Sequence, residues 1–201
     1  MAGQQLVLAS NNQKKIAEVQ AILSSTGIKV VTQSSVGVGE VVEDGLSFVE
    51  NALIKARHAA KVSGLPAIAD DSGLEVDALN GAPGIYSARY SGDGANDESN
   101  NQKLLQALQG QSQRSARFYC AIVYLKHADD PTPLIACGAW QGEILEQAQG
   151  KNGFGYDPLF YVPTHQCSSA QLAPEVKSQI SHRGQALRRF AELYQEHCAK
   201  Q

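Results

Sequence analysis

The stretch Ile68-Ala69-Asp70-Asp71-Ser72-Gly73-Leu74-Glu75-Val76 joins a short apolar run to two adjacent carboxylates and a Ser-Gly pair, after which apolar residues resume. Strand side chains point alternately to opposite faces, so Asp70 and Asp71 should face different ways. One could then bind a metal or activate water while the other holds a turn. Sites often lie where a strand opens into a loop, although these residue types also dominate ordinary turns. The stretch therefore predicts a strand followed by a turn, with a site as one of two interpretations.

The size and charge of the chain exclude several classes of protein. Its 201 residues fit one domain, residues 1–201, or one domain with a small lobe, and suffice for a real core. A composition of 43% hydrophobic and 18% charged residues is typical of a globular protein. The net charge of -3 argues against binding to a nucleic-acid backbone, but a few local lysines could still hold one nucleotide.

The cysteines and the amino-terminal residues bear on location. Cys120, Cys137, Cys167 and Cys198 show no Cys-x-x-Cys or metal-finger spacing, and the first two lie in apolar runs, where we expect small buried hydrophobic residues. Residues 1–5 lack the basic region of a signal peptide, and no apolar stretch approaches the length of a membrane span. We therefore expect a cytoplasmic protein that does not bind membranes.

Periodicity predicts strands alternating with helices, followed by a group of strands. We expect strands at residues 6–9, 28–31, 68–69, 74–76, 117–125, 134–140, 143–147 and 159–162, with a hairpin at Gln141-Gly142. We expect helices from residue 13, from 48 to about 62, from 97, over 171–179 and from 181. A capping box, Ser47 with Glu50, marks the second helix. The order indicates an α/β fold with a mixed sheet.

Three segments could hold a phosphorylated ligand or a metal. Ser10, Asn11, Asn12, Gln13, Lys14 and Lys15 lie between a strand and a helix, where amide groups and lysines attract anions, although the segment taken alone favours an Asn cap with two solvated lysines. Glu43 precedes the helix that carries Lys55 and could meet Asp71 around Mg²⁺, or could be an ordinary loop acid. Lys55 could equally belong to a solvated helix face.

Two further segments could contact a planar base. Gly153-Phe154-Gly155-Tyr156-Asp157-Pro158 combines two aromatic rings with an acid, and fits either a base-stacking loop or a tight turn with core aromatics. Ser181-His182-Arg183-Gly184 opens the last helix, where His and Arg could donate to a carbonyl or a phosphate, or where Ser181 could simply cap. Lys177 lies just before this segment.

Taken together, these segments resemble one family, the inosine triphosphatase-type purine nucleoside triphosphate pyrophosphatases, and within it the bacterial enzymes. The resemblance is carried, in family order along almost the whole chain, by residues 10–15, 48–52, 55–56, 69–74, 81–90, 154–158 and 181–184. The family removes ITP, dITP and XTP. Each motif is modest, but the ordered set is highly specific.

The resemblance implies an α/β fold with a mixed central sheet flanked by helices, two lobes with a cleft between them, and a homodimer. It implies a small-molecule purine nucleoside triphosphate as substrate. It further implies Mg²⁺-dependent hydrolysis at the α–β phosphoanhydride to the nucleoside monophosphate and pyrophosphate.

The resemblance also implies roles for individual residues. Asp71 resembles the family's acceptor of a proton from the attacking water, and Glu43 and Asp71 would hold the metal with Asp70 close by. Ser10, Asn12, Lys15, Lys55 and Lys177 would bind the phosphates, with Asn11, Gln13, Lys14 and Ser72 completing the substrate-binding set. Phe154, Gly155, Tyr156 and Asp157 would frame the base, and His182 and Arg183 would hydrogen-bond to its 6-oxo edge.

One segment departs from the family pattern, because some relatives place two adjacent acids and a Thr before Gly-Leu-Thr-Phe. Here Glu43 is followed by Asp44-Gly45-Leu46-Ser47-Phe48, so either Glu43 or Asp44 could reach the metal. Two alternative functions also stay open. The first is a pyrophosphatase or phosphatase for another nucleotide, such as a modified pyrimidine triphosphate. The second is a nucleotide sensor without catalysis.

Overall fold

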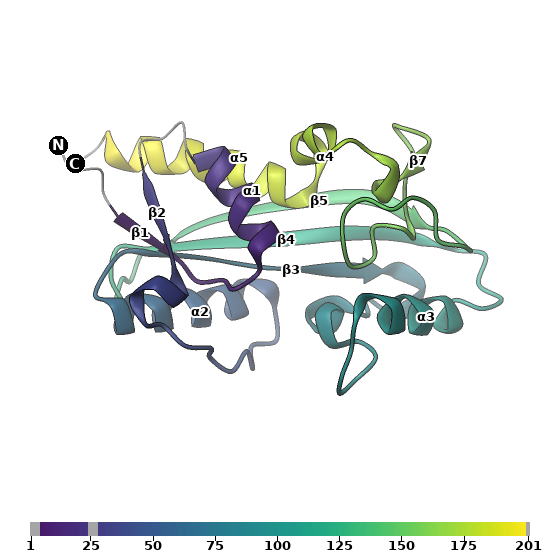
Figure 1. The fold of residues 1–201 in the computed structure, drawn as a ribbon, viewed down its shortest axis with the longest axis horizontal. Helices are drawn as coiled ribbons and strands as arrows, with labels where there is room; N and C mark the ends of the chain where they lie inside the picture. The colour runs from purple at the N-terminus through teal and green to yellow at the C-terminus, as the bar shows by residue number, and fades with distance from the viewer. Residues whose placement is uncertain (1–4, 24–27, 200–201) are drawn as a thin grey trace. The chain divides into compact units, whose positions relative to one another are not determined.

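A computed structural model describes residues 5–23 and 28–199, apart from the side chains of Lys14 and Ile22 (Figure 1). The chain forms two compact units. Unit 1 comprises Met1–Asp71, Cys120–Gly138 and Arg183–Gln201, and unit 2 comprises Ser72–Tyr119 and Ala139–His182. Within the described ranges, every helix is too short or too polar to span a bilayer.

The secondary structure confirms the predicted α/β class with a mixed sheet. The strands are β1 Gln5–Leu8, β2 Lys29–Thr32, β3 Ala67–Val76, β4 Ser115–Leu125, β5 Leu134–Ile144, β6 Phe160–Val162 and β7 Cys167–Ser168. The helices are α1 Gln13–Leu23, α2 Phe48–Ser63, α3 Asp97–Ala107, α4 Pro174–Ile180 and α5 His182–Cys198. The strands form one sheet in the order β2-β1-β3-β4-β5-β6-β7. Strand β1 is parallel to β2 and β3, whereas β6 is antiparallel to β5 and β7.

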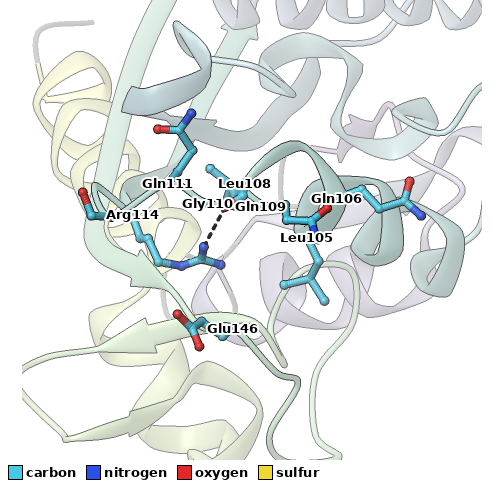
Figure 2. A pocket seen from close by; sticks show the side chains of 9 residues that line it. Leu105, Gln106, Leu108, Gln109, Gly110, Gln111, Arg114 and Glu146 are labelled. Atoms are coloured by element: carbon cyan, nitrogen blue, oxygen red, sulfur yellow. Dashed lines mark hydrogen bonds between the residues drawn. The ribbon is translucent and has the colours of Figure 1, made fainter.

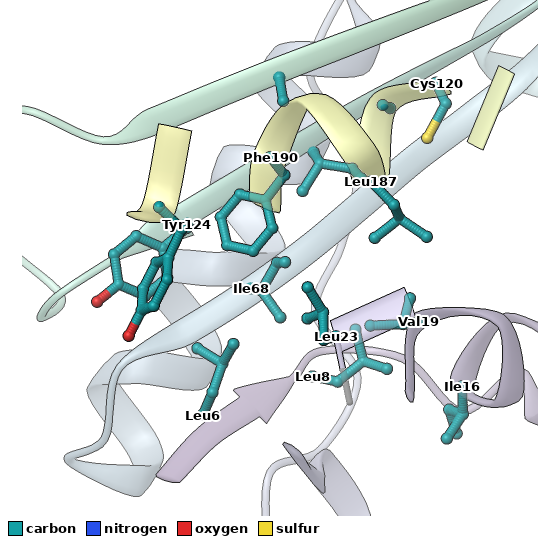
Figure 3. Packing of buried hydrophobic residues seen from close by; sticks show 14 residues of the cluster. Leu6, Leu8, Ile16, Val19, Leu23, Ile68, Cys120, Tyr124, Leu187 and Phe190 are labelled. Carbon is teal, nitrogen blue, oxygen red and sulfur yellow. The ribbon is translucent and has the colours of Figure 1, made fainter. Parts of the chain in front are cut away.

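The sheet of unit 1 is covered by helices on both faces, and neighbouring strand residues go to different faces. Ile68 of β3 packs in a buried cluster with residues of α1 and α5, which Figure 3 shows. Ala67 and Ala69, on either side of it, pack in a second cluster with α2. Because strand side chains alternate, Asp70 continues the α1–α5 face and Asp71 continues the α2 face.

Unit 2 has a core of its own. Leu74 and Val76 of β3 pack there with the inward side of α3 and with aromatic residues of β4, β5 and β6. The aromatic members of this core are Phe118, Trp140, Tyr156 and Phe160. Helix α3 is fixed at its start by Asn96, whose side chain accepts from the Ser99 N–H group and completes a capping box. The packed interior of unit 2 therefore holds both α3 and the loop that contains Tyr156.

The expected turn at Ser72-Gly73 is wrong. Strand β3 runs without interruption from Ala67 to Val76, so both carboxylates lie inside a strand. The sheet order places β1 and β4 on either side of β3. The described pairing with β1 ends at Ile68, so β4 is the neighbouring strand beyond that point, and this sheet context outweighs the local turn preference of Ser and Gly.

The expected hairpin at Gln141-Gly142 is also wrong, because β5 continues through it to Ile144. A Cβ atom on Gly142 would lie 2.4 Å from the Tyr161 carbonyl oxygen and 2.6 Å from the Phe160 ring. Glycine is present there for close approach of β6 and not for turning. The expected burial of Cys137 is wrong as well: Cys120 is buried, but Cys137 lies on the exposed face of β5, whose residues alternate between buried and exposed.

We predict that Gly142→Ala lowers the free energy of unfolding by about 1–3 kcal/mol, because the added methyl group must displace β6 backbone or the Phe160 ring. Urea denaturation followed by circular dichroism measures this change. Gly39→Ala is the matched control, since a Cβ at Gly39 meets nothing within 4 Å and should cost far less. Equal losses in the two variants would contradict the close-approach explanation.

Candidate active site

Asp70 lies at the centre of a buried ion-pair cluster on the α1–α5 face. Its Oδ2 atom is 3.0 Å from Lys15 Nζ and 3.3 Å from Arg183 Nε, while Arg183 Nη1 is 2.8 Å from Glu18 Oε2. Burial by itself would raise the pKa of Asp70, but Lys15 and Arg183 hold it well below its usual range. Burial opposes the charge of Arg183, yet Asp70 and Glu18 raise its pKa above the ordinary value. Asp70 is therefore a permanent anion whose charge is balanced internally.

Asp71 belongs to a second cluster on the α2 face. Lys55 Nζ of α2 lies 3.3 Å from Asp71 Oδ1 and 2.9 Å from Glu43 Oε2. Burial raises the pKa of Asp71, Lys55 lowers it, and Glu43 raises it, with a net upward direction. Burial would lower the pKa of Lys55, but Asp71, Asp70 and Glu43 together raise it. Asp70 is paired with two cations, whereas Asp71 is paired with one, which it shares with Glu43.

The Asp71 cluster fits a magnesium ion. Asp71 Oδ2 is buried and has no hydrogen-bond partner among the described residues, so one carboxylate oxygen is left for a ligand. Within the described ranges no group of three or more His, Cys, Asp or Glu side chains has metal-binding geometry. Mg²⁺ usually takes only one or two carboxylates and fills its remaining positions with water and substrate phosphates. Glu43 and Asp71 supply that number.

The loop that carries Glu43 is fixed to the start of α2. The buried Asn51 side chain accepts from the Gly45 N–H group at 2.9 Å, and a Cβ at Gly45 would lie 2.7 Å from Glu50 Cβ. Half of the predicted capping box is present, since Ser47 accepts from the Glu50 N–H group, whereas the Glu50 carboxylate accepts from the Leu46 N–H group and from Ser47 Oγ. Asp44 is exposed and makes no side-chain hydrogen bond or ion pair with the described residues. Its neighbour Glu43 is thus the acid that meets Lys55.

Residues 10–15 form the predicted helix start. The Asn12 side chain accepts from the Lys15 N–H group at 3.2 Å, and Ser10 Oγ accepts from the Asn12 N–H group at 3.2 Å. Asn11 donates to Glu40, and Gln13 is exposed. The Lys14 side chain lies outside the described residues. Lys15 differs from a solvated lysine, because its charge points to Asp70.

In unit 2, Asp157 is the internal anchor of the loop at residues 153–157. Its carboxylate accepts from the Phe154 N–H group, from Ser169 Oγ and from Lys177 Nζ, the last at 2.5 Å. A Cβ at Gly153 would lie 2.1 Å from Asp157 Oδ2, so the loop passes too close for any other residue. Lys177 Nζ also lies 5.1 Å from the Phe154 ring centroid. The structure therefore places Lys177 with this loop, whereas Lys15 and Lys55 belong to unit 1.

Two other residues predicted to frame or contact a base are largely buried. Tyr156 is a core residue whose hydroxyl donates to the Ser87 carbonyl at 2.8 Å. The His182 ring stacks on Phe118 at 4.8 Å between centroids. Phe154 is half-buried and is the loop aromatic with an accessible surface. Ser72, also half-buried, is the first β3 residue of unit 2.

A separate hollow of about 590 Å³ lies in unit 2 beside the end of α3 (Figure 2). It is lined by Leu105, Gln106, Leu108, Gln109, Gly110, Gln111, Ser112, Arg114 and Glu146. The Arg114 guanidinium donates to the backbone carbonyls of Leu108, Ile144 and Leu145. The guanidinium therefore joins the segment after α3 to the end of β5. None of the predicted site residues lines the hollow.

The structure gathers Lys15, Asp70 and Arg183 in one cluster and Glu43, Lys55 and Asp71 in the other. It adds Glu18, which our sequence analysis did not identify, as the partner of Arg183. The only sequence signal was an acid one helical turn after Lys15. In unit 2 it adds Asp97 and Asn101 of α3, which both hydrogen-bond to Gly155.

Comparison with known proteins places these clusters in context. The model of the Ham1 family matches residues 6–193. A dITP/XTP pyrophosphatase of Vibrio parahaemolyticus is 56% identical over 94% of this chain and 96% of its own length. One from Photobacterium profundum is 58% identical over 94% and 97%. The solved structure of a HAM1 protein from Coxiella burnetii superposes with a TM-score of 0.93 at 52% identity, covering 96% of this chain and 99% of its own.

We predict that Asp70→Asn lowers the free energy of unfolding by about 3–5 kcal/mol near neutral pH, because buried Lys15 and Arg183 lose their shared anion. The folded pKa of Asp70 lies below its unfolded value of about 3.9, so its contribution is complete above that pH. The contribution disappears as the pH falls toward the folded pKa. The difference between wild type and variant should therefore shrink below about pH 4.

Urea denaturation between pH 3 and 7 measures this difference. Glu192→Gln is the control, because the Arg189–Glu192 pair is exposed and should contribute less than about 1 kcal/mol. A difference between wild type and Asp70→Asn that stays constant down to pH 3 would contradict the charge explanation.

Proposed function

Because the chain belongs to the Ham1 family, we propose that it hydrolyses ITP, dITP and XTP at the α–β phosphoanhydride, with release of the nucleoside monophosphate and pyrophosphate. The relatives that match over nearly their full length carry the name dITP/XTP pyrophosphatase. The observation that carries the proposal is the Asp71 carboxylate, which has one oxygen on Lys55 and the other without a partner among the described residues.

Unit 1 provides the groups for the triphosphate. Lys15 and Lys55 offer two cations, and the start of α1 offers backbone N–H groups together with Ser10 and Asn12. Each lysine is held by a carboxylate before substrate arrives, which lowers the entropy lost when it binds phosphate. Lys177 is held in the same way by Asp157 of the loop at residues 153–157, and we assign it to the phosphates as well.

Glu43 and Asp71 would hold Mg²⁺. When bound, the ion would neutralise phosphate charge and favour departure of pyrophosphate. The hydrogen bond from the Gly45 N–H group to Asn51 of α2 fixes the loop that carries Glu43 and so keeps Glu43 in position for this task. The exposed Asp44 lacks such support, so we favour Glu43 over Asp44 as the metal ligand.

Asp71 would orient the attacking water and accept its proton. The net effect of its surroundings, burial first, raises its pKa, and a base with a raised pKa accepts a proton more readily. General-base assistance of this kind contributes on the order of 10²–10⁴-fold to a rate. Asp70 Oδ1 also has no hydrogen-bond partner among the described residues, but Asp70 is unsuited to the same task, because its pKa is held low and its Oδ2 is paired with Lys15 and Arg183.

Unit 2 would provide recognition of the base. Phe154 offers the accessible ring for stacking, while Tyr156 and Asp157 support the loop from inside. The resemblance implied donation to the 6-oxo group from His182 and Arg183, and we assign it to His182 or a backbone N–H, because Arg183 of unit 1 is buried and paired with Asp70 and Glu18. Adenine presents a donor at that position, and a site built on such a hydrogen bond can reject the wrong partner by roughly 10⁴-fold.

Neither alternative function accounts for the site as well. A nucleotide sensor has little need for a buried carboxylate with an open oxygen beside a lysine and a second acid. A pyrimidine-specific enzyme would share the phosphate cluster but would need a different base loop from the relatives. Dimerisation and a cytoplasmic location stay predictions, which light scattering and cell fractionation would test.

We predict that the purified protein releases pyrophosphate, and no orthophosphate, from ITP and XTP in the presence of Mg²⁺. Omission of Mg²⁺ should abolish release, and ATP should be turned over at least about 10³-fold less efficiently, because its 6-amino group faces a donor. Ion chromatography of the products measures both results. Orthophosphate as the product would indicate terminal cleavage, and equal efficiency with ATP would contradict recognition at position six.

We predict that Asp71→Asn lowers kcat for ITP by at least about 10²-fold, because the amide accepts a proton far less readily than the carboxylate. The fold should be retained, since Asn preserves the size of the side chain. Steady-state kinetics and a thermal melt measure the two effects. The control is Asp93→Asn in an exposed loop of unit 2. An Asp71→Asn enzyme that keeps most of its turnover would remove Asp71 from the role of base.

A further inference from the structure

Two side chains of α3 hold both polar groups of one residue in the base loop. Asp97 Oδ2 accepts from the Gly155 N–H group at 2.7 Å, and Asn101 Nδ2 donates to the Gly155 carbonyl at 2.9 Å. Asp97 and Asn101 are four positions apart, so they occupy one face of the helix. A single helix face therefore fixes the backbone of Gly155, although the contacts join positions 54 and 58 residues apart.

The neighbours of Gly155 show what these two contacts fix, which is the path of the loop on either side of Gly155. Gly155 has a left-handed φ of 62°, so it forms the bend of the loop. The half-buried Phe154 precedes it, and Tyr156, which is anchored in the core, follows it. On its other side, the Phe154 N–H group is held by Asp157. The direction of the Phe154 ring is thus set by Asp157 from within the loop and by α3 from outside it.

We call the two contacts of Asp97 and Asn101 with Gly155 the clamp. The Asn101 contact leaves one buried polar atom unpaired among the described residues. A backbone carbonyl can only accept, so the amide must turn its Nδ2 atom toward Gly155. This orientation leaves Asn101 Oδ1 buried without a hydrogen-bond partner among the described residues. An apolar side chain would avoid that unpaired acceptor but could not hold the Gly155 carbonyl.

Helix α3 is a rigid support for the clamp. The buried Asn100 side chain accepts from the Ser91 N–H group at 2.7 Å and donates to the Ala88 carbonyl at 3.2 Å. Leu104 and Leu108 fix the other end of the helical segment in the core of unit 2. Side chains that project from such a fixed helix can position a loop more accurately than side chains of another loop.

We propose that Asp97 and Asn101 are positioning residues that hold the base loop in the form that accepts a purine. The inference rests on the proposed function, because it assigns the loop at residues 153–157 to the base. The clamp acts on the base end of the substrate and leaves the triphosphate groups of unit 1 unchanged. Its loss should weaken binding of a nucleotide but not binding of a base-free polyphosphate.

The test compares Asp97→Ala and Asn101→Leu with wild type. Calorimetry in the presence of Mg²⁺ gives the Kd of α,β-imido-ITP, which is not hydrolysed, and of inorganic tripolyphosphate, which has no base. We expect the Kd for α,β-imido-ITP and the KM for ITP to rise about tenfold, the effect of losing one hydrogen bond. We expect kcat and the Kd for tripolyphosphate to stay within about twofold, because binding remote from the reaction is uniform.

Two further variants separate positioning from general structural support. Asp97→Asn keeps an acceptor oxygen and should restore nearly wild-type KM. Glu98→Ala removes an equal charge from the first turn of α3 without touching Gly155, and should change neither Kd nor KM. Thermal melts report whether each variant is folded.

Unchanged KM in both Asp97→Ala and Asn101→Leu would overturn the clamp, as would equal weakening of tripolyphosphate or an equal effect of Glu98→Ala. Failure of the proposed function gives a different result. Wild-type protein would then release no pyrophosphate from ITP, while calorimetry would still decide whether the two substitutions weaken the nucleotide analogue selectively.

Discussion

The pleat of β3 is the constraint on which the site depends. Successive residues of a strand must project to opposite faces, so Asp70 and Asp71 cannot share an environment although they are covalent neighbours. One face is closed by α1 and α5 and the other by α2. Each carboxylate therefore meets the cations of different helices. The two environments are separated by the thickness of one strand and would merge if the chain turned at this point.

The two environments produce two opposite electrostatic results from the same side chain. Asp70 receives two cations at one oxygen, which outweighs its burial and lowers its pKa. Asp71 must share Lys55 with Glu43, so burial prevails and its pKa rises. Pairs of acids whose surroundings move their pKa values apart are a recurrent arrangement in sites of proton transfer. In this chain the difference between the pKa values of Asp70 and Asp71 depends on the cations that the helices supply to each face of β3.

Much of this arrangement could be predicted from local sequence. The alternation at Asp70 and Asp71, the Ser47 cap and the Asn12 cap all depend on residues within four positions of one another. The errors at Ser72-Gly73 and Gly142 arose where pairing with distant strands outweighs a local turn preference. The ion pairs of Arg183 with Asp70 and Glu18 join residues 113 and 165 positions apart. No periodicity encodes such contacts, because they depend on how α5 packs against the sheet.

Fewer side chains are available for base recognition than the resemblance implies. Resemblance assigned the base to four consecutive residues, but Tyr156 is bonded inside the core, and Asp157 is committed to Phe154, Ser169 and Lys177. Those two side chains support the loop, so in the proposed function stacking would fall to Phe154. A ring held by bonds on both sides of its own backbone loses little conformational freedom when a base arrives. Under the proposed function, discrimination between bases would depend on where the loop holds its ring and donors, and hence on buried residues that need never touch the substrate.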